Sequence, residues 1–300
     1  MKTCLNESSD WIPQSLSQIL GIPNERIDLL KTQKIYSGGR LAVLMREINA
    51  DLSVCSDRMG RNSLHDVLMM VREAMCLQTE YRIIELGVSD DHKNILFVNP
   101  KMTTEYIGVD ITPTAFKFIS QKLCPFRRIK MRSVISAFED LSSPSEVYNL
   151  GDEPSIFLLL GWTYGNFAPN KIINTIKRIM KPNDLLVLET ATYTGDNTKS
   201  LLDFYQHELM QTFFYEITDE FNLDGVLKQL WIENGRKRAV VSVMVHNQKR
   251  DNQAHAVVLN VARKPSPREV VTDFTEKGFQ ELTHILSGDR NVAVFAFRRE

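Results

Sequence analysis

The sequence predicts an α/β protein in which a doubly wound parallel sheet is joined to a smaller α+β lobe. Between residues 81 and 190, short apolar runs alternate with helical patterns at the spacing of β/α units. These runs are nearly continuous in Ile, Leu and Val, as strands covered on both faces require. After residue 226, apolar segments follow one another between polar turns, which is typical of an antiparallel meander.

Length and composition limit the class of protein. The 300 residues suit one large domain or two small ones, and 43% hydrophobic with 24% charged residues is typical of a folded soluble chain. The net charge of −1 argues against a nucleic-acid partner. The longest apolar stretch, Ile156 to Leu160, is far shorter than the ~20 residues that span a bilayer. Without a visible signal peptide or CxxC motif, we expect a cytoplasmic protein that does not bind membranes.

The N-terminal part is expected to be helical. Residues 11–78 carry mostly helical patterns, interrupted by a polar turn at 36–39, and Ser63 is a plausible N-cap for the last helix. We assign residues 1–78 to the smaller lobe.

The core is expected over residues 79–200. Helical patterns fill residues 114–123 and 170–180. Buried strands are expected at the apolar runs between them, which are 82–86, 106–110, 128–131, 155–160 and 184–190.

The C-terminal third returns from the lobe to the core. Residues 201–262 combine a helical stretch with a meander at 227–232, 238–246 and 254–262, and are assigned to the lobe. Ser266 and Pro267 begin a last helix that Gly278 ends. A hairpin closes the core, so residues 263–300 are assigned to it.

Candidate ligand groups follow three of the expected core strands. In open parallel sheets, ligands bind beyond the carboxyl ends of the strands. Gly87 follows the first strand and permits a tight turn, Asp110 ends the second and can accept hydrogen bonds from a ribose diol, and Gly161 follows another. Alternatively, Gly87 only ends a strand and Asp110 only caps the next helix.

The loop after the first strand excludes a dinucleotide. It lacks a GxGxxG motif, and Asp90 and Asp91 stand where a pyrophosphate would lie and would repel it. A cofactor with a ribose but no phosphate, such as S-adenosylmethionine (SAM), fits better.

One segment carries a specific resemblance. Residues 157–167, FLLLGWTYGNF, are similar to the "FLGSTIGNF" segment of the SAM-dependent histidine Nα-trimethyltransferase family, which makes ergothioneine precursors and includes ergot tryptophan N-methyltransferases. Residues 109–112 resemble its "VDVS" strand end, and residues 34–39 its "KFYDxRG" segment. The resemblance implies a Rossmann-like class I methyltransferase fold with SAM as cofactor.

The resemblance also implies site residues. Asn166 and Tyr205 match the residues that hold the substrate and are the candidate catalytic pair. Asn166 could instead be a turn asparagine with positive φ, and Tyr205 a core aromatic. The expected cofactor-binding residues are Tyr36, Glu85, Gly87, Asp110, Ile111, Phe138, Gly161 and Trp162. The rings available to a sulfonium by cation–π contact are those of Tyr36, Trp162, Tyr164 and Tyr205.

Two departures from the family pattern affect the function. Ala137 replaces the acidic adenine contact, and no acid stands between Val257 and Ala262, where the family recognises imidazole. Histidine is therefore a doubtful substrate. We expect N-methylation of a small amino acid or amine, in secondary metabolism. The alternatives are cyclisation of SAM to azetidine-2-carboxylate and methylthioadenosine, and an inactive SAM- or partner-binding protein.

Other partners are not expected. The six histidines show no metal-ligand spacing, so no metal is predicted. A nucleic-acid methyltransferase is disfavoured because the charge is balanced and no Asp/Asn-Pro-Pro-aromatic tetrapeptide occurs. We expect a monomer or a homodimer that binds a small-molecule substrate.

Overall fold

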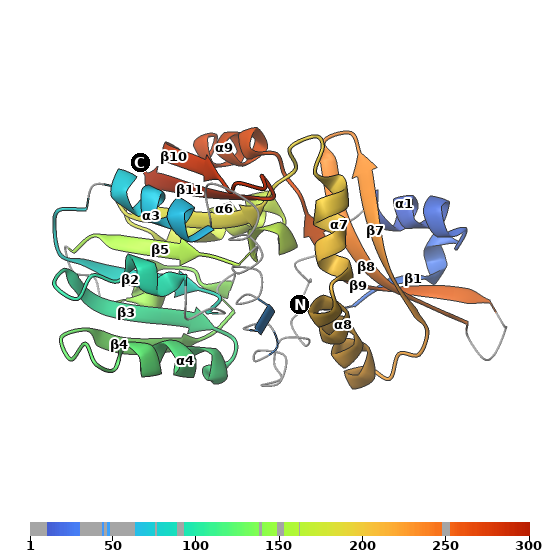
Figure 1. Cartoon of the computed structure of the whole chain (residues 1–300), viewed down its shortest axis with the longest axis horizontal. Coiled ribbons are helices and arrows are strands. Elements are labelled where there is room, and N and C mark those ends of the chain that lie inside the picture. The colour runs from blue at the N-terminus through green and yellow to red at the C-terminus, as the bar shows by residue number, and fades with distance from the viewer. Residues whose placement is uncertain are drawn as a thin grey trace.

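The described residues form two sheets, each with helices on both faces (Figure 1). The larger sheet belongs to the core and the smaller one to the lobe. The computed structural model describes residues 11–30, 44, 47–48, 64–75, 77–88, 93–137, 140–148, 153–161, 163–247 and 253–300. Within these residues, no helix is long and apolar enough to cross a membrane.

The core sheet has seven strands in the order β10-β11-β6-β5-β2-β3-β4. Strands β2 to β6 are parallel, whereas β11 runs antiparallel to both β6 and β10. This confirms the doubly wound, Rossmann-like sheet, whose order reverses at β2. The strands are β2 (Tyr81–Leu86), β3 (Thr103–Asp110), β4 (Lys130–Ile135), β5 (Ser155–Leu159), β6 (Leu185–Ala191), β10 (Phe279–Leu286) and β11 (Val292–Arg299).

Helices cover both faces of the core sheet. One face packs against α3 (Leu64–Ala74), the 3₁₀ helix η3 (Asn94–Phe97) and α4 (Pro113–Leu123). The other packs against α5 (Pro144–Val147), α6 (Pro169–Ile179) and α9 (Pro267–Thr275). Every residue of β2, β5 and β6 is buried, which explains why these strands are nearly continuous apolar runs.

Helix α3 corrects the expectation that residues 1–78 belong to the lobe as a whole. Its apolar stripe, Val67, Leu68 and Val71, is buried in the same cluster as residues of β11. The stripe predicts that the helix packs on a sheet but does not predict which one. The predicted N-cap Ser63 lies outside the described residues.

Within the part of the chain that the structure describes, the lobe sheet has four strands in the order β1-β9-β8-β7. Strands β7 (Val226–Asn234), β8 (Lys237–Asn247) and β9 (Ala254–Arg263) form the predicted antiparallel meander. Strand β1 (Ile27–Leu29), in a region read as helical, instead pairs with β9 in parallel. Three residues are too few to show an alternating pattern, so the sequence did not reveal β1.

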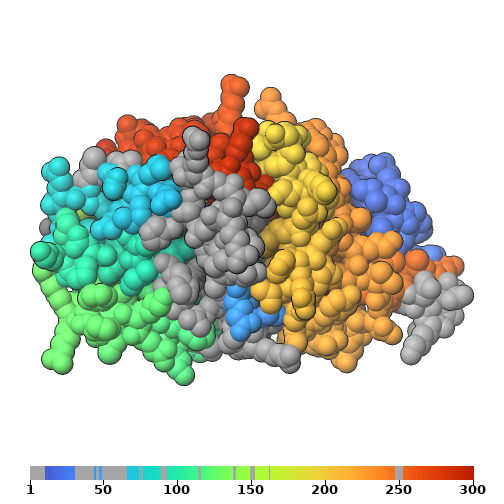
Figure 2. All heavy atoms as spheres, in the orientation of Figure 1, coloured from blue at the N-terminus to red at the C-terminus, as the bar shows by residue number. Residues whose placement is uncertain are grey.

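Helices also cover the lobe sheet on both faces. Residues of α7 (Thr198–Gln206) and α8 (Glu208–Glu220) pack on one face, and α1 (Trp11–Leu20) packs on the other. Figure 1 shows α7 and α8 on the side of the lobe that is turned toward the core, and Figure 2 shows the same helices in yellow at the middle of the molecule. The predicted segment boundaries at 200 and 262 remain predictions.

The last helix begins as the sequence predicts. The Ser266 hydroxyl accepts a hydrogen bond from the backbone N–H of Glu269, and the Glu269 carboxylate accepts one from the N–H of Ser266. This capping box sets the direction in which the chain leaves β9 and returns to the core. The strand expected at 128–131 begins two residues later than predicted, at Lys130.

Candidate functional site

Three predicted ligand groups gather at the carboxyl edge of the core sheet. Strand β2 lies between β3 and β5, so the residues that follow these strands are neighbours. Gly87 follows β2 with φ 75°, Asp110 ends β3, and Gly161 lies just beyond β5 with φ 77°. The backbone N–H of Gly87 donates to the carbonyl of Val109 at 2.8 Å, which ties the ends of β2 and β3 together.

Asp110 holds its carboxylate in a fixed orientation. Its Oδ1 accepts hydrogen bonds from the backbone N–H of Thr112 at 2.7 Å and from the Thr112 hydroxyl at 3.0 Å. Desolvation raises the pKa of Asp110, although these bonds and those from the backbone of Val88 and Ile111 act against the rise. The side chain is half-buried, so the carboxylate is restrained but within reach of a ligand. Ile111, also half-buried, forms the turn that follows.

Glu85 contacts other protein groups. Its side chain is 1% exposed, and its Oε2 accepts hydrogen bonds from Asn94 Nδ2 at 2.9 Å and from the Tyr106 hydroxyl. These contacts join β2 to η3 and β3. They favour a positioning role for Glu85 over the direct cofactor contact that we expected.

A buried ion pair that the sequence analysis missed links η3 to β6. Lys93 Nζ lies 2.9 Å from Glu189 Oε1, and the two side chains are 4% and 0% exposed. The second oxygen of Glu189 is buried and has no hydrogen-bond partner among the described residues. The available signal was a glutamate in the otherwise apolar stretch of β6, because a buried charge needs a partner.

The turn after β5 joins the core to the lobe. The 3₁₀ helix η5 (Thr163–Asn166) packs against the end of β9 so closely that a Cβ on Gly165 would lie 2.8 Å from the carbonyl oxygen of Arg263. Only glycine permits this approach of two backbones. Asn166 is half-buried at this junction. It is not among the positive-φ residues, which excludes the alternative that it only supports a left-handed turn.

Tyr205 comes from α7 on the lobe side of the same junction. It is 3% exposed, and its hydroxyl accepts a hydrogen bond from Lys264 Nζ at 2.9 Å. Lys264, which directly follows β9, is 1% exposed, and burial lowers its pKa to about 7. The sequence analysis missed Lys264 because a lysine after a strand is ordinarily solvated.

One of the rings proposed for the sulfonium belongs to the core. Tyr164 is 1% exposed, its ring packs against that of Phe274, and its hydroxyl donates to Asp273 Oδ2 at 3.3 Å. These contacts, and its place in the hydrophobic cluster of the core sheet, argue against the expected contact between the Tyr164 ring and the sulfonium. Tyr36, Phe138 and Trp162 lie outside the described residues.

A surface groove lies apart from this edge of the sheet. It has a volume of about 550 Å³, and none of the predicted site residues that the structure describes lines it. Arginines from β8, α9 and the β10–β11 turn contribute to its walls: Arg238, Arg268 and Arg290. Among the described residues, no group of three or more His, Cys, Asp or Glu could hold a metal ion.

The residues at the carboxyl edge fit SAM. Asp110 offers an acceptor for a ribose diol, and the positive φ of Gly87 and Gly161 gives the sharp turns after β2 and β5 that a ligand at this edge needs. When bound, SAM supplies an activated methyl group on its sulfonium, so the protein needs only to hold cofactor and acceptor in line and exclude water.

A comparison with models of known protein families matches more than half of this chain. A model described as "histidine-specific methyltransferase, SAM-dependent" matches residues 65–228, more than half of the chain. A search of curated protein sequences found no match.

Solved structures with a similar fold were also found. They include a SAM-dependent methyltransferase from Clostridium acetobutylicum ATCC 824, at 8% identity and TM-score 0.45, covering 78% of this chain and 90% of that one. The N-methyltransferase NodS from Bradyrhizobium japonicum WM9 gives 12% identity and TM-score 0.43, covering 78% and 93%. A SAM-dependent methyltransferase from Leishmania major gives 10% identity and TM-score 0.46, and the match covers 87% of this chain and 82% of that one. Similarities this distant carry no information about the substrate.

The segment matched by the family model contains the strands that carry the candidate cofactor-binding residues. The match begins in α3 and runs through β2, β3 and β5, the strands that carry Gly87, Asp110 and Gly161. The chain belongs to the family of histidine-specific, SAM-dependent methyltransferases, and it is a SAM-dependent methyltransferase of the class I fold.

Proposed function

We propose that this enzyme methylates the nitrogen of a small amine or amino acid that binds between Asn166 and Tyr205. The observation that carries the proposal is the close contact of Gly165 with Arg263, because it places Asn166 from the core beside the end of β9 in the lobe. The next residue, Lys264, is bonded to Tyr205. An amide and a hydroxyl from opposite sides of one junction can orient an amino acid by its amino and carboxylate groups.

The surroundings of Tyr205 favour an acceptor other than histidine. Val257, Leu259 and Ala262 of β9 are buried in the same apolar cluster as Tyr205. An imidazole placed against them would lose hydrogen bonds to water without gaining replacements. We infer that this segment does not recognise an imidazole and that the acceptor is not histidine, although the family is named for histidine.

The proposed roles follow from these positions. Asp110 holds the ribose, Gly87 and Gly161 provide room for the cofactor, and Asn166 and Tyr205 orient the acceptor nitrogen toward the methyl group. The contact between η5 and β9 closes one side of the site to water, which strengthens the polar contacts inside it. We further propose that the enzyme is a cytoplasmic monomer or homodimer and that it acts in secondary metabolism.

Mass spectrometry of the nucleoside product tests the proposed function. Purified protein is incubated with SAM alone and with SAM plus a pool of amino acids and amines. S-adenosylhomocysteine that forms only with the pool, together with a product heavier by one methylene, supports the proposal. Methylthioadenosine from SAM alone would instead indicate cyclisation, and no product from any mixture would indicate an inactive binding protein.

A pair of variants tests the acceptor site. We expect Asn166→Ala to lower kcat/KM about 10- to 100-fold, which corresponds to the loss of hydrogen bonds to a charged group. Asn174→Ala, at an exposed position on α6, is the matched control and should leave kcat/KM unchanged. Equal activities of both variants would contradict the assignment of Asn166.

A further inference from the structure

Lys264 is a buried amine placed directly behind the proposed acceptor site. It is 1% exposed, its Nζ lies 2.9 Å from the Tyr205 hydroxyl, and it also lies 4.8 Å from the centre of the Tyr205 ring. The backbone N–H of Lys264 donates to the carbonyl of Arg238 at 2.9 Å. The backbone of Lys264 is therefore anchored to the lobe sheet, and its amine contacts the side chain of Tyr205 on α7.

The charged groups around this segment come from several elements. Arg263 precedes Lys264 on β9, and Arg238 on β8 is paired with Glu269 of α9 at 3.2 Å. From η5, the hydroxyl of Tyr164 faces Asp273. Burial, the largest cause of the shift, brings the pKa of Lys264 to about 7, so both the neutral and the charged amine are populated near neutral pH.

The proposed reaction needs a group that removes a proton. An amino acceptor is largely an ammonium near pH 7, since the pKa of a free amino acid or amine lies well above 7, and an ammonium has no electron pair with which to attack a methyl group. A tyrosine hydroxyl can accept one proton while it donates another. Tyr205 therefore can connect an acceptor to Lys264 without changing its own charge.

We propose that Lys264 is the proton acceptor of the methyl transfer and acts through Tyr205. The ammonium of the bound acceptor gives a proton to the Tyr205 oxygen, and the Tyr205 hydroxyl proton passes to the neutral amine of Lys264. The acceptor nitrogen keeps the electron pair that forms the new N–C bond. The methyl–sulfur bond of SAM breaks in the same step, and its electron pair stays on the sulfur of S-adenosylhomocysteine. Lys264, now an ammonium, releases its proton to water after turnover. This inference rests on the proposed function, because it requires an amino group at Tyr205.

The first test is a pH profile of kcat/KM for three variants. In the wild type, kcat/KM should rise through a limb near pH 7 as Lys264 loses its proton. Lys264→Met should remove this limb and lower kcat/KM about 10- to 100-fold at pH 7, with a smaller deficit at pH 9.5, where the acceptor deprotonates in solution. Lys264→Arg, which stays charged, should be as impaired as Lys264→Met. Lys199→Met, exposed on α7, is the control and should keep the wild-type profile.

A structural role predicts a different outcome. If Lys264 only donates a hydrogen bond to Tyr205, arginine should restore activity and the limb near pH 7 should persist in both variants. That result would overturn the inference and leave the proposed function intact. Failure of the wild type to methylate any amine would instead overturn the proposed function.

A second measurement does not depend on activity or on the folding of Lys264→Met. The ε-methylene signal of Lys264 is followed by NMR in the wild-type enzyme between pH 5 and 10, with the assignment taken from Lys264→Arg. A midpoint near pH 7 supports the inference. An amine that stays charged through pH 9 cannot accept the proton and would overturn it.

Discussion

At the scale of single residues, the site depends on a few side chains whose partners fix their orientation. Asp110 accepts two hydrogen bonds from Thr112, so its carboxylate is held in place before any ligand arrives. Such preorganisation reduces the entropy that binding must overcome. The family pattern has an acid at the adenine contact as well, but Ala137 stands there in this chain. Asp110 is therefore expected to contribute a large share of cofactor affinity.

Asp110→Asn should weaken SAM binding about 10- to 100-fold. The amide keeps the oxygen that accepts from Thr112, but it loses the charge that strengthens hydrogen bonds from a diol. Isothermal titration calorimetry with SAM measures the effect. Asp203→Asn, at an exposed position on α7, is the control. Equal affinity of Asp110→Asn and wild type would contradict the role of Asp110.

Gly165→Ala should destabilise the protein and impair acceptor binding together. Its Cβ would lie 2.8 Å from the backbone oxygen of Arg263, and relief of such a clash costs about 1–3 kcal/mol. Gly195→Ala is the comparison, because the Cβ there meets no atom within 4 Å and only the φ of 100° is strained. Both variants should unfold at lower urea concentration, but only Gly165→Ala should raise the KM for the acceptor. An unchanged KM would show that η5 does not shape the site.

At the scale of elements, local signals predicted much of the fold. The apolar run at 155–160 became β5, and the Ser266-Pro267 pair began α9, because both signals lie within a few neighbouring residues. By contrast, β1 exists only through its pairing with β9, and α3 could have packed on either sheet. The partner of such an element is far away in the sequence, so no local pattern identifies it.

The residues of the candidate site also divide into those that local patterns predict and those that depend on distant partners. Gly87 and Asp110 could be predicted because the ends of adjacent parallel strands meet at one edge of the sheet. Lys264 could not, because its burial depends on α7 and β8 folding over it. The cofactor contact of Glu85 stays a prediction. Its hydrogen bonds to Asn94 and Tyr106 could not be predicted for a similar reason, because these partners lie on other elements.

The capping box of α9 gives a prediction for an element. Ser266→Ala removes the hydroxyl that accepts from the N–H of Glu269 and should cost about 1 kcal/mol, or a fall in Tm of about 2 °C. Ser266→Thr should restore most of the loss. Ser143→Ala is the control, because the Ser143 hydroxyl bonds only the exposed side chains of Ser145 and Glu146 and makes no capping bond to the backbone of α5. Differential scanning calorimetry compares the three variants, and no difference between Ser266→Ala and Ser143→Ala would contradict the capping role.

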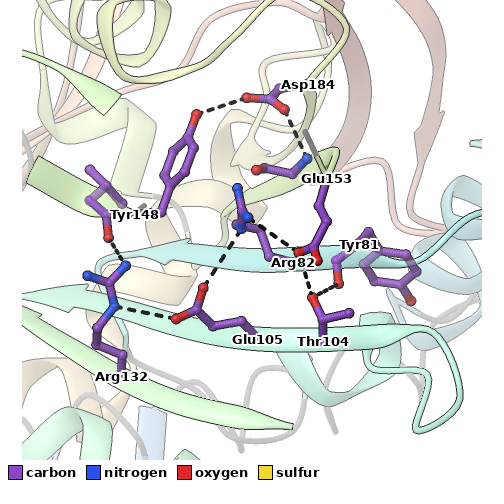
Figure 3. Close-up of polar contacts among 10 residues, drawn as sticks. Tyr81, Arg82, Thr104, Glu105, Arg132, Tyr148, Glu153 and Asp184 are labelled. Atoms are coloured by element: carbon purple, nitrogen blue, oxygen red, sulfur yellow. Dashed lines mark hydrogen bonds and ion pairs between the residues drawn. The ribbon is translucent and has the colours of Figure 1, made fainter. Parts of the chain in front are cut away.

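At the scale of the whole molecule, the two edges of the core sheet have different polar groups. Figure 3 shows a network at the amino edge, opposite the candidate site. Arg82 contacts Glu105 and Glu153, which tie β2 to β3 and to the segment before β5. Asp184 accepts hydrogen bonds from the backbone of Ser155 at 2.9 Å and from the Tyr148 hydroxyl at 3.3 Å. These groups bond one another rather than a ligand, and they hold the amino ends of the strands together.

The pKa of Asp184 gives a pH-dependent prediction. Desolvation raises it above the ordinary value despite the bonds from Lys181 and Ser155. Because the pKa of Asp184 is higher in the folded than in the unfolded protein, its protonated form stabilises the fold. This contribution to the free energy of unfolding is present below about pH 4 and is lost as the pH rises through the folded-state pKa. The free energy of unfolding of wild type minus that of Asp184→Asn should therefore decrease as the pH rises above about 4. Urea titrations measure it, with the exposed Asp219→Asn as control. A difference that increases with pH would contradict the sign.

The contact between Gly165 and Arg263 has a consequence for redesign of the enzyme. A lobe taken from another family member could be exchanged only if the backbone at the end of its β9 reached the same position against η5. A shift of one residue there would turn side chains toward the wrong face and displace Lys264 from Tyr205. Substrate range is therefore more safely altered by changing side chains of the lobe than by grafting its strands.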